Sequence, residues 1–247
     1  MKALYLKSRG TPYPEAPGIA TLGDVEEALW MNTASETILV HLPAYREPEL
    51  IPTILDALAH ATFPARIHFG ICRQYNPEDG FDNLDEYKDD HRFKIYEVNY
   101  KSAQGLPWAR GIINDTLLTD ETYVLQLDAH HRFVKNWDAI LIATHNKLEE
   151  THAKPIITGY TPEYNPFNDP AGRVLIPWMS GFRCFYPLGT IFIGPQELTG
   201  WQGLNAPVPA RFLCGHFDFA RAQWARDVRH DPSIYFAGEE INLTVRS

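Results

Sequence analysis

The sequence predicts an α/β domain with a mostly parallel sheet flanked by helices, followed by a loop-rich second half. Short apolar runs alternate with helical patterns between residues 37 and 158. After Tyr160, proline, glycine and aromatic residues become dense and the segments shorten. Strands that alternate with helices favour parallel pairing, because each helical crossover returns the chain to the same end of the sheet. Ligands of such sheets collect at the carboxyl ends of the strands.

The predicted elements follow one another in a regular order. Pro48 suits a helix entry, where its missing N–H costs little, and Asn136 is a plausible helix N-cap. Pro43 is expected to end the first strand. The predicted strands are Ile38–Leu42, Ile67–Cys72, Phe93–Val98, Tyr123–Leu127 and Pro155–Thr158, and the predicted helices are Pro48–Ala61, Leu106–Leu118 and Trp137 to about Glu150.

Residues 1–36 predict an N-terminal arm or small subdomain, and residues 37–247 the main domain. The first segment is rich in proline and glycine and has one short helical pattern, around Asp24–Met31. The Met1–Gly10 start lacks an apolar signal core, and no run approaches the roughly 18–20 apolar residues of a membrane span. We therefore expect no membrane span and a cytoplasmic location.

The net charge and the cysteine spacing limit which classes of partner are expected and whether disulfides are expected. The net charge is −9 without any long basic run, which argues against nucleic acid as a partner. The three cysteines, Cys72, Cys184 and Cys214, are widely spaced and odd in number. Free thiols are expected rather than a disulfide framework.

The apolar run Tyr123–Leu127 ends abruptly in Asp128-Ala129-His130. Residues i and i+2 of an extended chain project to the same side, so Asp128 and His130 are expected to point together and His131 away. One carboxylate and one imidazole suit a borderline divalent ion such as Mn²⁺. The pair therefore predicts a metal site for a diphosphate, although a plain strand-end turn gives the same triplet.

Three further patterns have both a functional and a structural interpretation. Glu239-Glu240 after Gly238 could bind an acceptor hydroxyl, or only open a helix, whose first turn favours acids. Arg110, near a helix entry, could contact phosphate or lie on the surface. Ala44, Tyr45 and Arg46 follow the first strand and could contact a nucleotide base, or form an ordinary turn.

Taken together and in order, these segments resemble a known family. They resemble the α-N-acetylglucosaminyltransferases that act on polypeptide hydroxyl groups, which include cytoplasmic enzymes modifying hydroxyproline on Skp1 and the mucin-type enzymes of trypanosomes. The resemblance runs from about Thr37 to the C-terminus, and four ordered blocks make it specific. These blocks are residues 44–50, 66–74, 123–138 and 236–241.

The resemblance implies a GT-A fold, a Rossmann-like nucleotide-sugar-binding architecture. It implies UDP-GlcNAc as donor, Mn²⁺ or Mg²⁺ as cofactor, and retaining transfer to a hydroxyl on a polypeptide or saccharide. Asp128 and His130 become the metal ligands. The donor contacts implied are Ala44, Tyr45, Arg46, Arg110 and Asp128, and the acceptor-side acids are Glu239 and Glu240.

Two departures from the family pattern leave alternatives open. The loop around Gly105 has Gln104 and Leu106 where the family has other residues. A third metal-binding histidine is expected beyond Glu240, so either His216 or His230 replaces it, or the chain is a C-terminally truncated or divergent form. An inactive UDP-sugar- or carbohydrate-binding module and a metal-dependent hydrolase remain alternatives. The sequence leaves open the donor sugar (GlcNAc, GalNAc or glucose), the acceptor and the oligomeric state.

Overall fold

The computed structural model describes residues 2–3 and 36–247, except for positions 170, 172, 175, 188 and 205. The expected N-terminal arm and its helical pattern around Asp24–Met31 fall almost wholly outside the described residues. Among the residues that are described, no helix has the length and apolar character needed to cross a membrane.

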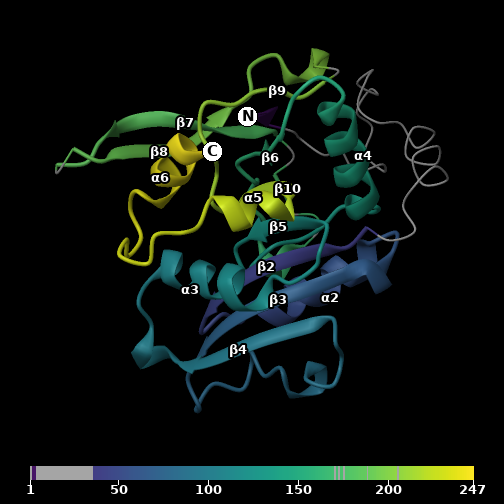
Figure 1. Cartoon of the computed structure of the whole chain (residues 1–247), viewed down its shortest axis with the longest axis vertical. Helices are drawn as coiled ribbons and strands as arrows, with labels where there is room; N and C mark the ends of the chain where they lie inside the picture. Colours follow the sequence, from purple (N-terminus) through teal and green to yellow (C-terminus); the bar gives the residue numbers. More distant parts are fainter. Residues whose placement is uncertain are drawn as a thin grey trace.

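A central sheet of eight strands organises the fold, in the order β4-β3-β2-β5-β10-β6-β1-β9 (Figure 1). Strands β4, β3, β2 and β5 are parallel neighbours, whereas β10 runs antiparallel to both β5 and β6. The strands are β1 (Lys2–Ala3), β2 (Ile38–Tyr45), β3 (Ile67–Tyr75), β4 (Phe93–Asn99), β5 (Tyr123–Leu127), β6 (Ile157–Thr158), β9 (Val208–Pro209) and β10 (Phe217–Arg221). A mostly parallel sheet is thus confirmed for the first half of the chain.

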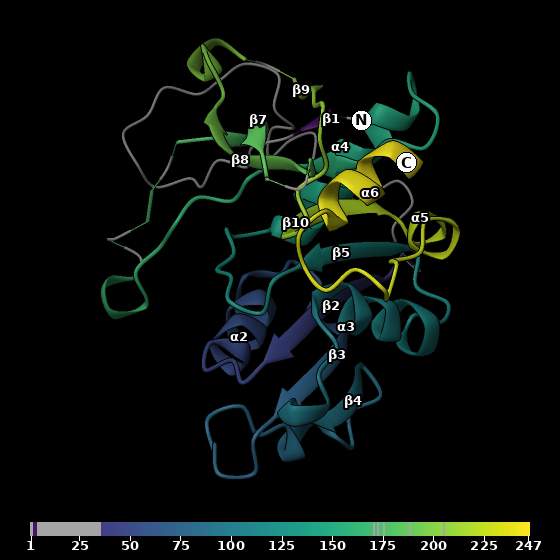
Figure 2. The ribbon, with the colours of Figure 1, turned by 90° about the vertical axis from the view of Figure 1, so that its left-hand side faces the viewer.

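Helices cover both faces of the sheet, as Figure 2 shows for α2 and α3. Helices α2 (Leu50–His60) and α4 (Trp137–Glu149) pack on one face, against a core that includes Phe69, Leu125 and Phe219. Helices α3 (Leu106–Ile112) and α5 (Ala222–Asp227) cover the other. Alternate residues of each buried strand supply the two cores, since successive side chains point to opposite faces.

The second half adds a separate hairpin and a last helix. Strands β7 (Trp178–Phe185) and β8 (Ile191–Glu197) form the antiparallel hairpin, and α6 (Glu239–Arg246) lies beside it (Figures 1 and 2). The remaining short helical turns are η1 (Pro64–Arg66), η2 (Asp85–Tyr87), η3 (Tyr100–Ser102), η4 (Ile113–Leu117, a π turn that continues α3), η5 (Pro166–Asn168) and η6 (Trp201–Gly203).

The expectation that Pro43 ends the first strand is wrong, because β2 continues to Tyr45. Pairing of β2 with β5 stops at His41, whereas pairing with β3 runs to Tyr45. The amide of Arg46 bonds to Gln74 of β3, so by alternation residue 43 faces the other edge. Proline is tolerated there because no neighbouring strand requires its missing N–H.

The second half is more than a loop-rich cover, because it also supplies the strand β10. This strand enters the sheet between β5 and β6. Its sequence, Phe-Asp-Phe-Ala-Arg, contains a charged residue, Asp218, that is completely buried. An aspartate in so short a run hides the strand from pattern analysis, since acids are rare in strands.

Phe219 offers a direct test of the inserted strand. Its side chain is fully buried and stacks on Tyr123 of β5, with 5.0 Å between the ring centroids. Phe219→Ala should therefore lower the free energy of unfolding by about 3–5 kcal/mol. Phe167→Ala is the matched control, because Phe167 is 97% exposed, and should change it by less than about 0.5 kcal/mol. Denaturant unfolding measures both, and equal effects would contradict the placement of β10.

Candidate functional site

Asp128 and His130 lie together just past the end of β5, as the strand pattern predicts. The Oδ2 atom of Asp128 is 3.9 Å from Nε2 of His130. Both side chains line a cavity with a volume of about 510 Å³. The other lining residues are His131, Arg132, Val134, Tyr160, Thr161, Pro162, Glu163, Tyr164, Arg173, Val174 and His216. The carboxyl end of the central strand thus opens onto a cavity of mixed polar and apolar lining, large enough for a small ligand.

Glu47 fixes the orientation of the His130 ring. Its Oε2 atom lies 2.9 Å from Nδ1 of His130. This contact is the main reason that the pKa of His130 is raised above its ordinary value. An N–H at Nδ1 donated to the carboxylate leaves the lone pair on Nε2, the nitrogen that faces Asp128. Glu47 belongs to the sequence block 44–50, but the sequence alone assigned it no role, although it follows the end of β2, the strand beside β5.

Arg110 connects the strand end to the last helix. It is 1% exposed, and its guanidinium donates to Asp128 Oδ1 at 3.0 Å and to Glu239 Oε2 at 2.7 Å. Burial by itself would raise the pKa of Asp128, but Arg110 and the nearby histidines hold it below its ordinary value. Arg110 was expected in the first turn of its helix, and it lies instead in the last turn of α3. Two nitrogens of the Arg110 guanidinium donate to these acids. Arg110 therefore affects the site by holding the carboxylate of Asp128 in place.

The two glutamates at the start of α6 have different surroundings. Glu239 is 4% exposed and is held by Arg110, which keeps its pKa low although burial opposes this. Glu240 accepts a bond of 2.9 Å from the amide of Gly215, and burial raises its pKa. Both therefore open a helix, as the structural interpretation predicted, and both also lie within the charge network of Asp128 and Arg110.

Of the two histidines considered as replacement ligands, only His216 lines the cavity with Asp128. His230 does not line this cavity, and its side chain is 6% exposed. Its Nε2 is 2.8 Å from Gln126 Oε1 and its Nδ1 is 2.8 Å from Glu239 Oε1. Both nitrogens of His230 thus have close oxygen neighbours, which leaves His216 as the histidine with access to the cavity.

His131 was expected to point away from Asp128 and His130, and this is wrong. The chain is no longer extended after β5, so the alternation of side chains stops. His131 lines the same cavity, and its Nδ1 lies 2.9 Å from the backbone oxygen of Asp128. Burial lowers the pKa of His131 and of His216 to about 4, so both rings are neutral near pH 7.

Ala44 and Tyr45, at the end of β2, and the following Arg46 do not line this cavity. Ala44 is fully buried, whereas Tyr45 is 55% exposed and meets Tyr100 edge to face. The Arg46 guanidinium donates to Asp79 at 2.7 Å and lies over the Tyr100 ring. Arg46 has a φ of +47°, a left-handed conformation that ends the extended chain of β2. Tyr45 therefore offers an exposed aromatic ring at the strand ends, supported by the half-buried Tyr100.

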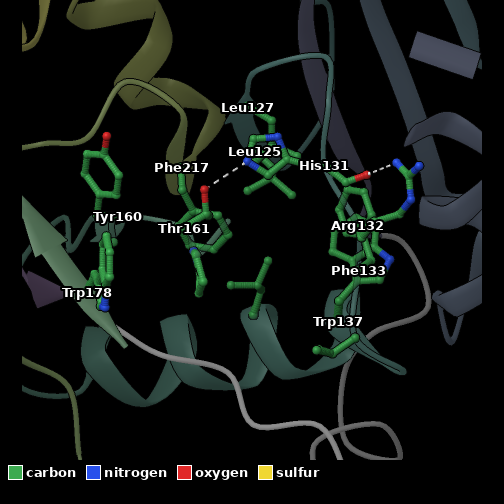
Figure 3. Close-up of a pocket in the computed structure, with 14 residues that line it drawn as sticks. Leu125, Leu127, His131, Arg132, Phe133, Trp137, Tyr160, Thr161, Trp178 and Phe217 are labelled. Carbon is green, nitrogen blue, oxygen red and sulfur yellow. Dashed lines mark hydrogen bonds between the residues drawn. The ribbon is translucent and has the colours of Figure 1, made fainter. Parts of the chain in front are cut away.

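A second, apolar pocket shares a wall with the cavity. It has a volume of about 130 Å³, and Figure 3 shows it between Trp137 of α4 and the pair Tyr160 and Trp178. His131 and Thr161 belong to the shared wall, where the His131 Nε2 and the Thr161 hydroxyl are 3.3 Å apart. The two hollows therefore differ in character: the larger is the more polar and borders Asp128, and the smaller is lined mainly by hydrocarbon.

Solved structures of low sequence identity share this fold. GalNAc-T7, solved with UDP, GalNAc and Mn²⁺, has a TM-score of 0.62 at 14% identity, over 87% of this chain and 41% of that chain. S. aureus TarS has a TM-score of 0.55 at 14% identity, over 85% and 34%, and its segment 1–349 has 0.52 at 13%, over 84% and 54%. The chain therefore spans about half or less of the length of these proteins. It has the GT-A glycosyltransferase fold.

Sequence comparison identifies the family. No curated protein matches the chain. The model of a family described as glycosyltransferase (GlcNAc) matches residues 37–92 and 81–247, which together include the whole of the main domain. The matched segments contain the strand-end pair Asp128 and His130, Glu47, Arg110 and both glutamates of α6. The chain belongs to the GlcNAc glycosyltransferase family.

Proposed function

We propose that this protein is a metal-dependent, retaining glycosyltransferase that moves N-acetylglucosamine from UDP-GlcNAc to a hydroxyl group, on a polypeptide hydroxyproline, serine or threonine. The observation that carries the proposal is the pairing of Asp128 Oδ2 with His130 Nε2 at the rim of the larger cavity. Family membership supports the donor sugar. The UDP and Mn²⁺ in the GalNAc-T7 structure support the donor nucleotide and the metal by analogy of fold.

The residues present fit a borderline divalent ion. Arg110 donates a hydrogen bond to Oδ1 of Asp128, and Nδ1 of His130 is hydrogen-bonded to Glu47. One carboxylate oxygen and one imidazole nitrogen are left facing each other, which is an oxygen and nitrogen donor set suited to Mn²⁺. Bound there, the ion would neutralise the charge that develops on a departing diphosphate.

The protein groups around this pair would orient the reactants. Arg110 keeps Asp128 ionised and fixed, because it is buried and bonded to two acids. Glu239 holds Arg110 in turn, and is therefore a positioning residue. Glu240, whose carboxylate has only the Gly215 amide as its hydrogen-bond partner among the described residues, is the candidate for binding the acceptor or a sugar hydroxyl.

The transfer itself exchanges one bond for another at the anomeric carbon. The bond from that carbon to the UDP oxygen breaks while the acceptor oxygen forms a new one from the same face. The hydroxyl proton passes to the departing phosphate oxygen, so no protein base or covalent nucleophile is required. The exposed ring of Tyr45 would stack on the uracil, since aromatic faces bind bases in this way.

Removing either metal ligand should abolish metal-dependent turnover. Asp128→Asn and His130→Ala are each expected to lower kcat/KM by at least about 100-fold, because charge neutralisation on the leaving group is lost. The measurement is UDP release from UDP-GlcNAc with and without Mn²⁺, in the presence of a hydroxyproline peptide. His91→Ala is a matched control, since the side chain of His91 is 88% exposed and far along the chain from the site.

The same assay separates the alternatives. Unchanged Mn²⁺-dependent turnover in both variants would refute the assignment of the metal site. UDP release that is equally fast without any acceptor would favour a hydrolase. Binding of UDP-GlcNAc in calorimetry without turnover, over a panel of acceptors, would favour a binding module.

The two glutamates should respond differently to loss of charge. Glu240→Gln is expected to reduce kcat by about 10–1,000-fold with little change in the Kd of UDP, because its carboxylate acts on the acceptor side. Glu239→Gln is expected to raise the Mn²⁺ concentration needed for half-maximal activity by about 10–100-fold, because Arg110 then holds Asp128 less firmly. Glu150→Gln, an exposed site in the turn after α4, is the control. Equal losses of UDP affinity and turnover in Glu240→Gln would indicate a structural role instead.

A further inference from the structure

A second cluster of metal-binding side chains lies beside the site just described. Cys214 and His216 come from the segment that enters β10, and Glu240 comes from the first turn of α6. One potential ligand atom from each residue falls within a mutual distance of 4.8 Å. Among the described residues, no other group of three or more His, Cys, Asp or Glu side chains meets this criterion.

The spacing is close to that of a tetrahedral zinc site. Zinc–sulfur bonds of about 2.3 Å and zinc–nitrogen bonds of about 2.0–2.1 Å place neighbouring ligand atoms roughly 3.5 Å apart. The Cys214 sulfur already lies 3.3 Å from both nitrogens of His216. One ligand atom of Glu240 lies within 4.8 Å of the ligand atoms of Cys214 and His216. A small rotation of the Glu240 side chain would therefore bring its carboxylate to a zinc-binding separation.

The hydrogen bonds of these residues leave them able to bind an ion. The Thr161 amide donates to His216 Nε2 over a long distance, 3.3 Å, so that nitrogen carries the lone pair of the neutral ring. A metal at Nε2 would replace this weak bond. Glu240 uses Oε1 to accept from Gly215, and a carboxylate has a second oxygen to offer.

We propose that Cys214, His216 and Glu240 form a second metal site, which takes a borderline-soft ion such as Zn²⁺ rather than Mn²⁺. The thiolate decides this preference, because sulfur ligands select zinc over harder ions, whereas Asp128 and His130 offer only oxygen and nitrogen. The thiol proton passes to solvent as the metal–sulfur bond forms. Three protein ligands leave a fourth position open, as in zinc sites that exchange their ligands.

Zinc at this site would join two parts of the chain that lie far apart in sequence. Cys214 is fully buried, and its neighbour Gly215 is held between Glu240 and Gln126, whose amide donates to the Gly215 oxygen at 2.9 Å. An ion bound to Cys214 and Glu240 would fix α6 to the start of β10. If Glu240 acts on the acceptor as proposed above, the same ion would also inhibit transfer.

Cobalt absorption spectroscopy tests the site directly, independently of any transferase activity. Co²⁺ takes zinc positions, and a cobalt–thiolate bond gives an intense charge-transfer band in the near ultraviolet. Co²⁺ titrated into the full chain should give this band at one equivalent, and Zn²⁺ should remove it. The Asp128→Asn, His130→Ala double variant should keep the band, because the thiolate site does not include those residues.

Cysteine variants decide whether Cys214 is the ligand. Cys214→Ser should abolish the band, and His216→Asn should weaken Co²⁺ binding by about tenfold or more, while Cys184→Ser is the matched control with an exposed cysteine and should leave the band intact. Circular dichroism checks folding, and His216→Asn keeps the test valid should Cys214→Ser not fold. A missing band in the wild type, or a band that survives both Cys214→Ser and His216→Asn, would overturn the proposal.

Discussion

The buried guanidinium of Arg110 is the interaction on which the arrangement of the site depends. It joins Asp128, at the end of a central strand, to Glu239, at the start of the last helix, and its backbone oxygen lies 3.1 Å from His41 Nε2. A charge so deeply buried is stable only with such partners, since an unpaired one would cost several kcal/mol. The Cβ of any residue replacing Gly215 would lie only 2.7 Å from Arg110 Nη1, so a side chain there would displace the guanidinium.

The parallel half of the sheet explains why the polar groups meet at one edge. Strands β2 and β5 are parallel neighbours, so the residues that follow them leave the sheet at the same end. Glu47 from the first and His130 from the second therefore come within hydrogen-bonding distance. Arg110 holds Asp128, and Glu47 holds His130, although neither Arg110 nor Glu47 is itself a proposed ligand. Proteins usually orient metal-binding side chains in this way.

Burial controls the protonation of the histidines around this edge. Desolvation lowers the pKa of His131 and His216, whereas the carboxylate of Glu47 raises that of His130. Three imidazoles within one cavity therefore differ in their affinity for a proton because their neighbours differ. The neutral ring of His216 can offer a lone pair to the second proposed ion, whereas His130 has its Nδ1 held by Glu47 and its Nε2 facing Asp128.

The sequence by itself determined the parallel half of the fold, because strand periodicity and helix spacing are local properties of the chain, and it located Asp128 and His130 just past the end of a buried strand. The family resemblance added the two glutamates of α6, and Arg110 by analogy, without their contacts. Only the tertiary structure showed that Arg110 bridges Asp128 and Glu239, that Glu47 orients His130, and that β10 lies inside the sheet. The hydrogen bonds of Arg110 and Glu47 join residues 18 to 129 positions apart in the sequence. Such pairs form because a buried charge needs an opposite charge or a hydrogen-bond partner, and no local sequence pattern specifies which distant residue provides it.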